Sequence, residues 1–176
     1  MKRRLLILAA AAALAGCAST TPMDYAAEKP VLDLRSYFNG ELIGHGMFSD
    51  RSGKVLRRFT VQITGTWNGP EGTLDERFIW SDGKTERRVW RLRELAPGRY
   101  SGRADDVVGE ALGAAAGNAL NWQYTLRLPV DDKVFEVQFD DWMFLIDERT
   151  MLNRAVMSKF GIRLGEVLLS FRRLPA

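Results

Sequence analysis

The sequence has 176 residues, of which 46% are hydrophobic, 10% aromatic and 27% charged, and its formal net charge is +3. This composition is typical of a globular domain and excludes a disordered or collagen-like chain. The length predicts one domain, since domains commonly have about 100–200 residues, and it excludes two-lobed enzymes such as kinases.

The N-terminus has the features of a secretory signal. Basic residues at positions 2–4 precede an apolar run from Leu5 to Leu14, which is shorter than the roughly 20 residues of a membrane-spanning helix. The run closes with Leu14-Ala15-Gly16-Cys17, which resembles the lipobox of bacterial lipoproteins, where the cysteine receives the lipid. We therefore predict a signal peptide over residues 1–16 and lipidation, with palmitate among the acyl groups, at Cys17. An ordinary signal peptide followed by an incidental cysteine is the alternative.

The charge of the mature chain bears on its partners. Cleavage after residue 16 removes three of the 25 basic residues and leaves the mature charge at about zero, so we expect no nucleic acid as a partner. Ala18 follows the cysteine, and in lipoproteins of Gram-negative bacteria a residue other than Asp there implies transfer to the outer membrane. We expect a lipid-anchored protein of the cell envelope on the periplasmic face of that membrane. Residues 17–31 are expected to form the lipidated N-terminus and a flexible tether, and residues 32–176 a single domain.

From Leu32 onward the dominant hydrophobic period is two, which is the period of β-strands. In residues 59–67 Phe, Val, Ile and Trp alternate with Thr and Gln, which predicts a half-buried strand. Residues 120–128 and 135–139 alternate in the same way, and further strands are predicted at 41–48, 73–81, 86–95, 99–104 and 165–174. The side chains expected inside the fold are Phe59, Val61, Ile63, Trp67, Trp122, Tyr124, Leu126, Phe135, Val137 and Phe139.

Short turn sequences rich in Gly, Pro, Asp or Asn separate these strands. They occur at residues 50–53, 68–72, 81–84, 96–98 and 130–133. Successive strands joined by such turns predict an antiparallel meander. About eight or nine strands of this spacing predict an all-β fold, an up-and-down barrel of the lipocalin type, because closure also removes exposed edges. A curved β-sandwich is the alternative.

The segment 105–118 breaks the alternation and carries Gly109, Gly113 and Gly117 at four-residue spacing. A Gly-rich strand or bulged hairpin is the preferred interpretation, and a short helix is the alternative. Small side chains at these positions leave room inside a barrel, or let another backbone or a ligand approach closely.

Several strings of the sequence together resemble one bacterial family. They are residues 40–42, 104–109 and 117–119, the run Phe139-Asp140-Asp141-Trp142-Met143, and Lys159-Phe160-Gly161. From about Leu34 to Phe171 the chain is similar to the lipoproteins grouped as domain of unknown function 3833. The resemblance implies an exported lipoprotein, and it implies neither an established activity nor recognised catalytic residues.

The sequence offers few residues for catalysis. His45 is the only histidine, and its position in a predicted strand favours packing or a surface role over a Ser-His-Asp site. One Cys and one His cannot form a Cys/His zinc site, and we expect neither a metal nor a cofactor. Asp105, Asp106, Asp140 and Asp141 could supply the two carboxyl groups of a glycoside hydrolase. Adjacent strand residues point to opposite faces, so at most one of each pair enters a cavity, and the sequence does not favour an enzyme.

These features favour a lipocalin-like binding module for a lipid or another apolar ligand at the membrane surface. A structural or interaction protein of the envelope, with a filled barrel and a protein partner, is the second hypothesis, and a carboxylate-based hydrolase is the third. The residues expected to line the mouth of the cavity or fix its shape are Asp105, Asp106, Asp140, Asp141, Trp142 and Arg154.

Overall fold

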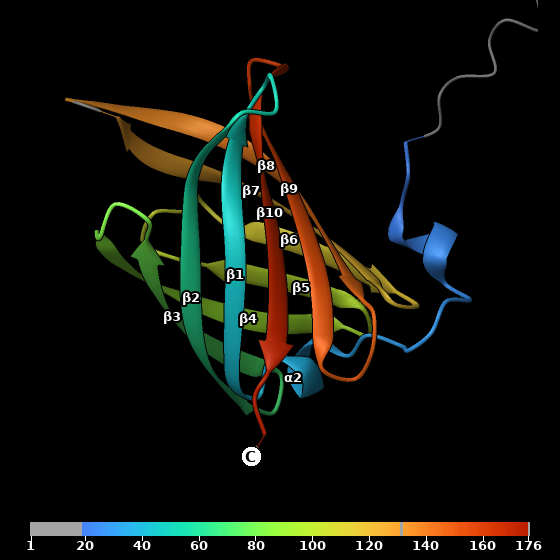
Figure 1. Cartoon of the computed structure of the whole chain (residues 1–176). Helices are drawn as coiled ribbons and strands as arrows, with labels where there is room; N and C mark the ends of the chain where they lie inside the picture. Colours follow the sequence, from blue (N-terminus) through green and yellow to red (C-terminus); the bar gives the residue numbers. More distant parts are fainter. Residues whose placement is uncertain (1–18, 131, 176) are drawn as a thin grey trace, which may run out of the picture.

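The computed structural model describes residues 19–130 and 132–175, in which the chain forms a closed barrel of antiparallel strands (Figure 1). Each strand pairs with the next along the chain, and the last strand closes on the first. The predicted signal peptide and Cys17 lie outside the described residues. Within the described part of the chain, no helix is long and apolar enough to cross a membrane.

Ten strands make up the wall. They are β1 (Gly40–Asp50), β2 (Val55–Asn68), β3 (Glu71–Trp80), β4 (Thr85–Ala96), β5 (Arg99–Arg103), β6 (Ala111–Ala116), β7 (Ala119–Val130), β8 (Lys133–Leu145), β9 (Thr150–Lys159) and β10 (Ile162–Arg173). The predicted all-β, up-and-down barrel is confirmed, with slightly more strands than expected. The β-sandwich alternative is wrong, because β10 pairs with β1 and leaves no open sheet.

Strands β6 and β9 lack the regular alternation of apolar and polar residues that most other strands show. Strand β6 confirms the preferred interpretation of the Gly-rich segment, and the short-helix alternative is wrong. Strand β9 was not among the predicted ranges. Its inward residue Asn153 is polar, and its outward residue Leu152 is apolar and 48% exposed. The side chains of β9 therefore alternate between the two faces of the wall, but apolar and polar residues do not alternate along its sequence.

The side chains predicted for the interior form the core. Val61 and Ile63 are fully buried, and the predicted members of β7 and β8 lie in the same cluster or pack against it. Trp67 is half-buried near the end of β2, where it packs over Gly72. A Cβ at Gly72 would lie 2.5 Å from the Trp67 ring, so the indole needs glycine at that position.

A single-turn helix, α2 (Leu34–Tyr37), closes one end of the barrel (Figure 1). The Asp33 carboxylate caps it by accepting a hydrogen bond of 2.6 Å from the Ser36 amide, and Leu34 and Tyr37 are buried. Phe38 follows the helix, and its carbonyl lies where a Cβ on residue 65 would be. Gly65 therefore lets α2 sit against the barrel.

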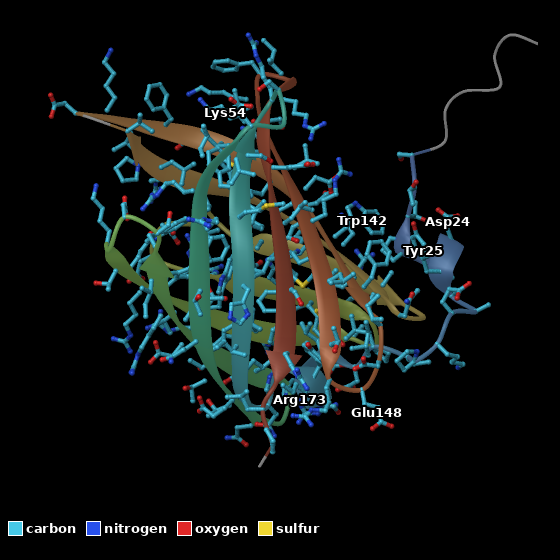
Figure 2. The ribbon with its side chains drawn as sticks, viewed as in Figure 1. Asp24, Tyr25, Lys54, Trp142, Glu148 and Arg173 are labelled. Atoms are coloured by element: carbon cyan, nitrogen blue, oxygen red, sulfur yellow. The ribbon has the colours of Figure 1, made fainter. Side chains whose placement is uncertain are left out.

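The N-terminal segment packs against the outside of the barrel. It contains the 3₁₀ turn η2 (Pro22–Tyr25), whose Tyr25 lies beside Trp142 (Figure 2). The Tyr25 ring meets those of Trp142 and Phe144 edge-on, at centroid distances of 6.0 and 5.1 Å. The Leu32 amide donates a hydrogen bond of 2.8 Å to the Gly117 carbonyl. These contacts place Tyr25 of the expected tether, and Leu32 directly after it, against the barrel.

The wall is less fully paired between β4 and β7. Strand β5 is short and pairs with β4 only from Arg91 onward, so residues 85–90 of β4 pair on the β3 side alone. The connection 104–110 occupies the space toward β7, where Val107 bridges to Leu126. Two backbone hydrogen bonds hold the connection against β7. The amide of residue 108 donates to the carbonyl of residue 125 at 2.9 Å, and the amide of residue 127 donates to the carbonyl of residue 106 at 2.8 Å.

Candidate functional site

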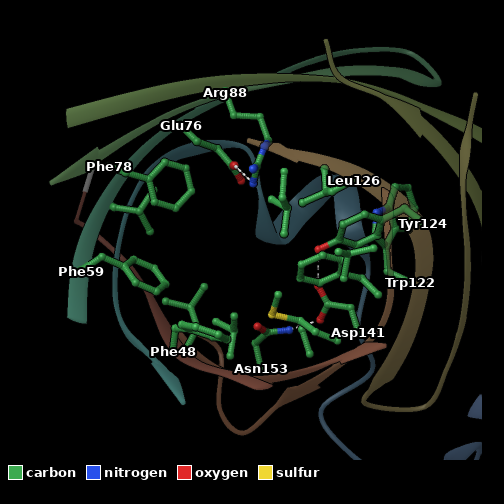
Figure 3. Close-up of a pocket in the computed structure, with 18 of the residues that line it drawn as sticks. Phe48, Phe59, Glu76, Phe78, Arg88, Trp122, Tyr124, Leu126, Asp141 and Asn153 are labelled. Atoms are coloured by element: carbon green, nitrogen blue, oxygen red, sulfur yellow. Dashed lines mark hydrogen bonds and ion pairs between the residues drawn. The ribbon is translucent and has the colours of Figure 1, made fainter. Parts of the chain in front are cut away.

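The barrel is hollow. Its lumen contains a cavity of about 830 Å³ (Figure 3), within the range of roughly 300–1,000 Å³ that is usual for small-molecule sites. Leu34 and Phe38 line its closed end, and the cavity opens at the opposite end, where its lining includes Arg57, Val130 and Lys159. Side chains therefore do not fill this barrel.

Most of the lining is aliphatic or aromatic. Alternation along each strand turns these side chains inward, and the aromatic ones pack against one another. The Tyr124 ring stacks on Phe139 at 4.9 Å and meets Trp90 edge-on at 5.5 Å. Apolar members of the lining include Leu74, Phe78, Leu92, Leu120, Trp122, Leu126, Val137, Met157 and Leu169.

One polar cluster on the cavity wall is centred on Arg88 of β4 (Figure 3). Its guanidinium lies 2.7 Å from Asp106, 3.9 Å from Glu76 and 3.8 Å from Glu86. Glu76 is buried, and burial raises the pKa of its carboxyl to about 7 although the Arg88 charge lowers it. The cluster therefore holds one cation among several carboxyl groups.

A second polar cluster contains Asp141 of β8 and Asn153 of β9 (Figure 3). The Asn153 amide donates a hydrogen bond to Asp141 Oδ1, and the Tyr124 hydroxyl lies 3.5 Å from Oδ2. Burial raises the pKa of Asp141 to about 7, against the effect of these two hydrogen bonds. Burial therefore favours the neutral form of this carboxyl.

Two cations line the cavity near its opening. Arg57 donates two hydrogen bonds, of 3.1 and 3.0 Å, to the Asp82 carboxylate, and its guanidinium lies 4.0 Å from the Trp80 ring centroid. The Lys159 ammonium lies 4.6 Å from the centroid of Phe135. The opening thus carries positive charge next to aromatic surface.

Of the six residues that the sequence predicted at the cavity, two are connected with it. Asp141 lines it directly, and Asp106 reaches it through the ion pair with Arg88. Asp105 is exposed in the connection between β5 and β6.

The other three nominated residues point away from the lumen. Asp140 is exposed and accepts a hydrogen bond of 2.6 Å from Asn121. Trp142 stacks on the outer face with Phe144 and contacts the N-terminal segment. Arg154 is exposed and pairs with Glu166 at 3.0 Å. Alternation explains these positions, since each lies beside an inward residue, Asp141 or Asn153, on its strand.

The prediction from the sequence missed six charged or amide side chains that line the cavity: Arg57, Glu76, Glu86, Arg88, Asn153 and Lys159. For Glu76 a signal existed, because it occupies an inward position between Leu74 and Phe78 in a predicted strand. A polar residue in the apolar register of a strand indicates a polar group inside the barrel. His45, by contrast, is exposed on β1 and does not line the cavity.

A family comparison agrees with the sequence. The model of the family described as protein of unknown function DUF3833 matches residues 11–173. The chain belongs to the DUF3833 family. The resemblance seen in the sequence is thereby confirmed, and the match covers every strand of the DUF3833 barrel. No curated protein matches this DUF3833 chain.

Solved structures share the fold of this DUF3833 protein. The S-type phycobiliprotein lyase CPES from Guillardia theta matches with a TM-score of 0.58 and 5% identity, over 78% of this chain and 89% of the lyase chain. A protein of unknown function from the DUF3598 family of Nostoc punctiforme matches with a TM-score of 0.57 and 14% identity, over 89% of this chain and 53% of the other. At such identities the likeness concerns the fold alone.

Proposed function

We propose that the protein is a binding module that holds a lipid or another apolar molecule inside the barrel. The cavity of about 830 Å³ carries this proposal. Concave, mostly apolar sites with a few polar groups are the usual form of ligand sites. A filled barrel, which the structural or interaction hypothesis requires, does not fit a lumen of this size.

The energetics of the lumen support an apolar ligand. Transfer of an acyl chain from water gains about 0.8 kcal/mol for each buried CH₂ group. The wall is closed by strand pairing from β1 to β10, so the site exists before the ligand arrives and little conformational entropy is lost on binding.

We further propose that the protein is an outer-membrane lipoprotein anchored through Cys17. The support is the sequence Leu14-Ala15-Gly16-Cys17 after the apolar run. The position of the N-terminal segment is compatible with an anchor, because Tyr25 packs outside the barrel on Trp142 and Phe144. An anchor attached there leaves the cavity free for a ligand.

The proposed role is binding without catalysis. The lone histidine, His45, is exposed on the outer face of β1. Of the adjacent carboxylate pairs considered for hydrolysis, Asp105 and Asp140 are exposed, and Asp106 is held in an ion pair with Arg88 at 2.7 Å. Asp141 alone of these four residues lines the cavity. The name of the Guillardia theta lyase supports a ligand-handling barrel, but at 5% identity it supports no shared reaction.

Native mass spectrometry of the full chain, isolated from the cells that make it, tests the proposed function. We expect the wild-type protein to retain a lipid-sized ligand. Ala155 is buried and lines the cavity, so Ala155→Trp narrows the lumen and should lower the retention of the ligand. Leu152→Trp is the matched control, because residue 152 lies on the same strand and is 48% exposed. Wild-type protein that carries no ligand, and gains none when a long-chain lipid is added, overturns the proposal.

A further inference from the structure

Lys159 is a cation placed at the opening of the cavity. It is the last residue of β9, is half-buried and lines the cavity. Its ammonium lies 4.6 Å from the Phe135 ring centroid and 5.3 Å from that of Phe160. Among the described residues, no carboxylate forms an ion pair with it. Its donors are therefore available to a ligand.

The other cations of the cavity wall are already engaged. Arg57 donates two hydrogen bonds to Asp82. Arg88 lies among three carboxyl groups, and it donates a hydrogen bond of 2.8 Å to Asp106. An anionic ligand group thus has one uncompensated cation to bind on the described wall, and that cation is Lys159.

The depth of the lumen offers an anion no free cation. Glu76 and Asp141 are buried carboxyl groups of the cavity wall, and the cation beside Glu76, Arg88, is already paired. An anion placed there meets repulsion whenever either carboxyl is ionised. Glu86 also lines the cavity, but it lies on β4, which the strand order places across the barrel from β9. The distribution of charge therefore favours one orientation of the ligand, with its anionic group at the opening of the cavity.

We infer that the ligand is an amphiphile whose anionic headgroup, a carboxylate or a phosphate, binds the ammonium of Lys159, with its apolar tail in the lumen. The inference rests on the proposed function and adds the chemical class and the orientation of the ligand. Charge-assisted hydrogen bonds are stronger than neutral ones, so the headgroup adds affinity that a neutral lipid lacks.

Fluorescence titration with cis-parinaric acid and its methyl ester tests the inference, because the two probes share a chain and differ in charge. The full chain is kept in solution by an amphipol. We expect the wild-type protein to bind the acid about tenfold more tightly than the ester, the size of a charge-assisted hydrogen bond in a half-buried site. Lys159→Gln should lower the affinity for the acid to that for the ester, and Lys159→Arg should preserve the difference.

Lys133→Gln is the control variant, since Lys133 is an exposed lysine that does not line the cavity; it should bind both probes as the wild type does. Displacement of the bound acid by palmitate alone identifies a carboxylate ligand, and displacement by lysophosphatidate alone identifies a phosphate. Equal wild-type affinity for acid and ester, or equal losses for both in Lys159→Gln, overturns the inference but leaves the proposed function standing. Binding of neither probe to the wild type overturns both.

Discussion

Asp141 should make the stability of the protein depend on pH. Burial raises its pKa from 3.8 to about 7 in the folded state. Between these values the folded protein holds a proton that the unfolded chain has released, so the free energy of unfolding falls as pH rises. Below about pH 4 the carboxyl is neutral in both states and costs little. Above pH 7 it is ionised in both, and the full penalty of burying a charge is present.

The change in the free energy of unfolding follows from the difference between the two pKa values of Asp141. A difference of roughly three pKa units corresponds to about 4 kcal/mol, a large part of the 5–15 kcal/mol that usually stabilises a domain. Asp141→Asn keeps an oxygen that can accept the hydrogen bond from Asn153 and removes the ionisation. At pH 8 the variant should be more stable than the wild type by up to about 4 kcal/mol, and the gain should shrink toward pH 4.

Urea unfolding at pH 4.5, 6 and 8 measures this directly. Glu136→Gln is the matched control, because Glu136 is an exposed carboxylate on the same strand, five residues from Asp141, and its loss should not alter the pH dependence. Glu76, whose pKa is also raised to about 7 by burial, leaves part of the pH dependence in place in Asp141→Asn. An Asp141→Asn protein with the same change of stability between pH 4.5 and 8 as the wild type would refute the reasoning.

Three further predictions concern the lipid anchor, the closed end of the barrel and the N-terminal segment. Metabolic labelling with palmitate should mark the wild type and not Cys17→Ala; equal labelling of both proteins contradicts the lipoprotein proposal. Gly65→Ala should lower the free energy of unfolding by about 1–3 kcal/mol, the usual cost of overpacking, because its Cβ overlaps the Phe38 carbonyl; an unchanged urea midpoint contradicts this. Tyr25→Ala removes the contact with Trp142, so limited proteolysis should cleave the N-terminal segment faster while the barrel persists; an unchanged cleavage rate is the contrary result.

The fold was predictable because, along most strands, apolar side chains point into the barrel and polar side chains point out of it. Strand β2 shows this most clearly, with Phe59, Val61 and Ile63 buried and the intervening residues exposed or half-buried. Strand β9 could not be found in this way, since Asn153 points inward and Leu152 outward. The helix α2 has only four residues, which is too short for a helical period to appear in the sequence.

The site was predictable only in part. Alternation required one residue of Asp140 and Asp141 to point inward, but the choice depends on how β8 is set against the core. The partners of Asp141 and Asp106 come from other strands, Asn153 from β9 and Arg88 from β4. Such pairs depend on the register between neighbouring strands and on the path of their connections, which the alternation along one strand does not contain.

The shortness of β5 and β6 gives the barrel a seam. Along residues 85–90 the backbone of β4 has no strand neighbour on the side toward β7, and the connection 104–110 is tied to β4 there through the ion pair between Asp106 and Arg88. Separating the wall at this seam breaks that ion pair and a few hydrogen bonds. Separating it between two paired strands breaks a whole row of backbone hydrogen bonds. The amides of β4 along the seam should therefore exchange hydrogen sooner than those of strands that are paired on both sides.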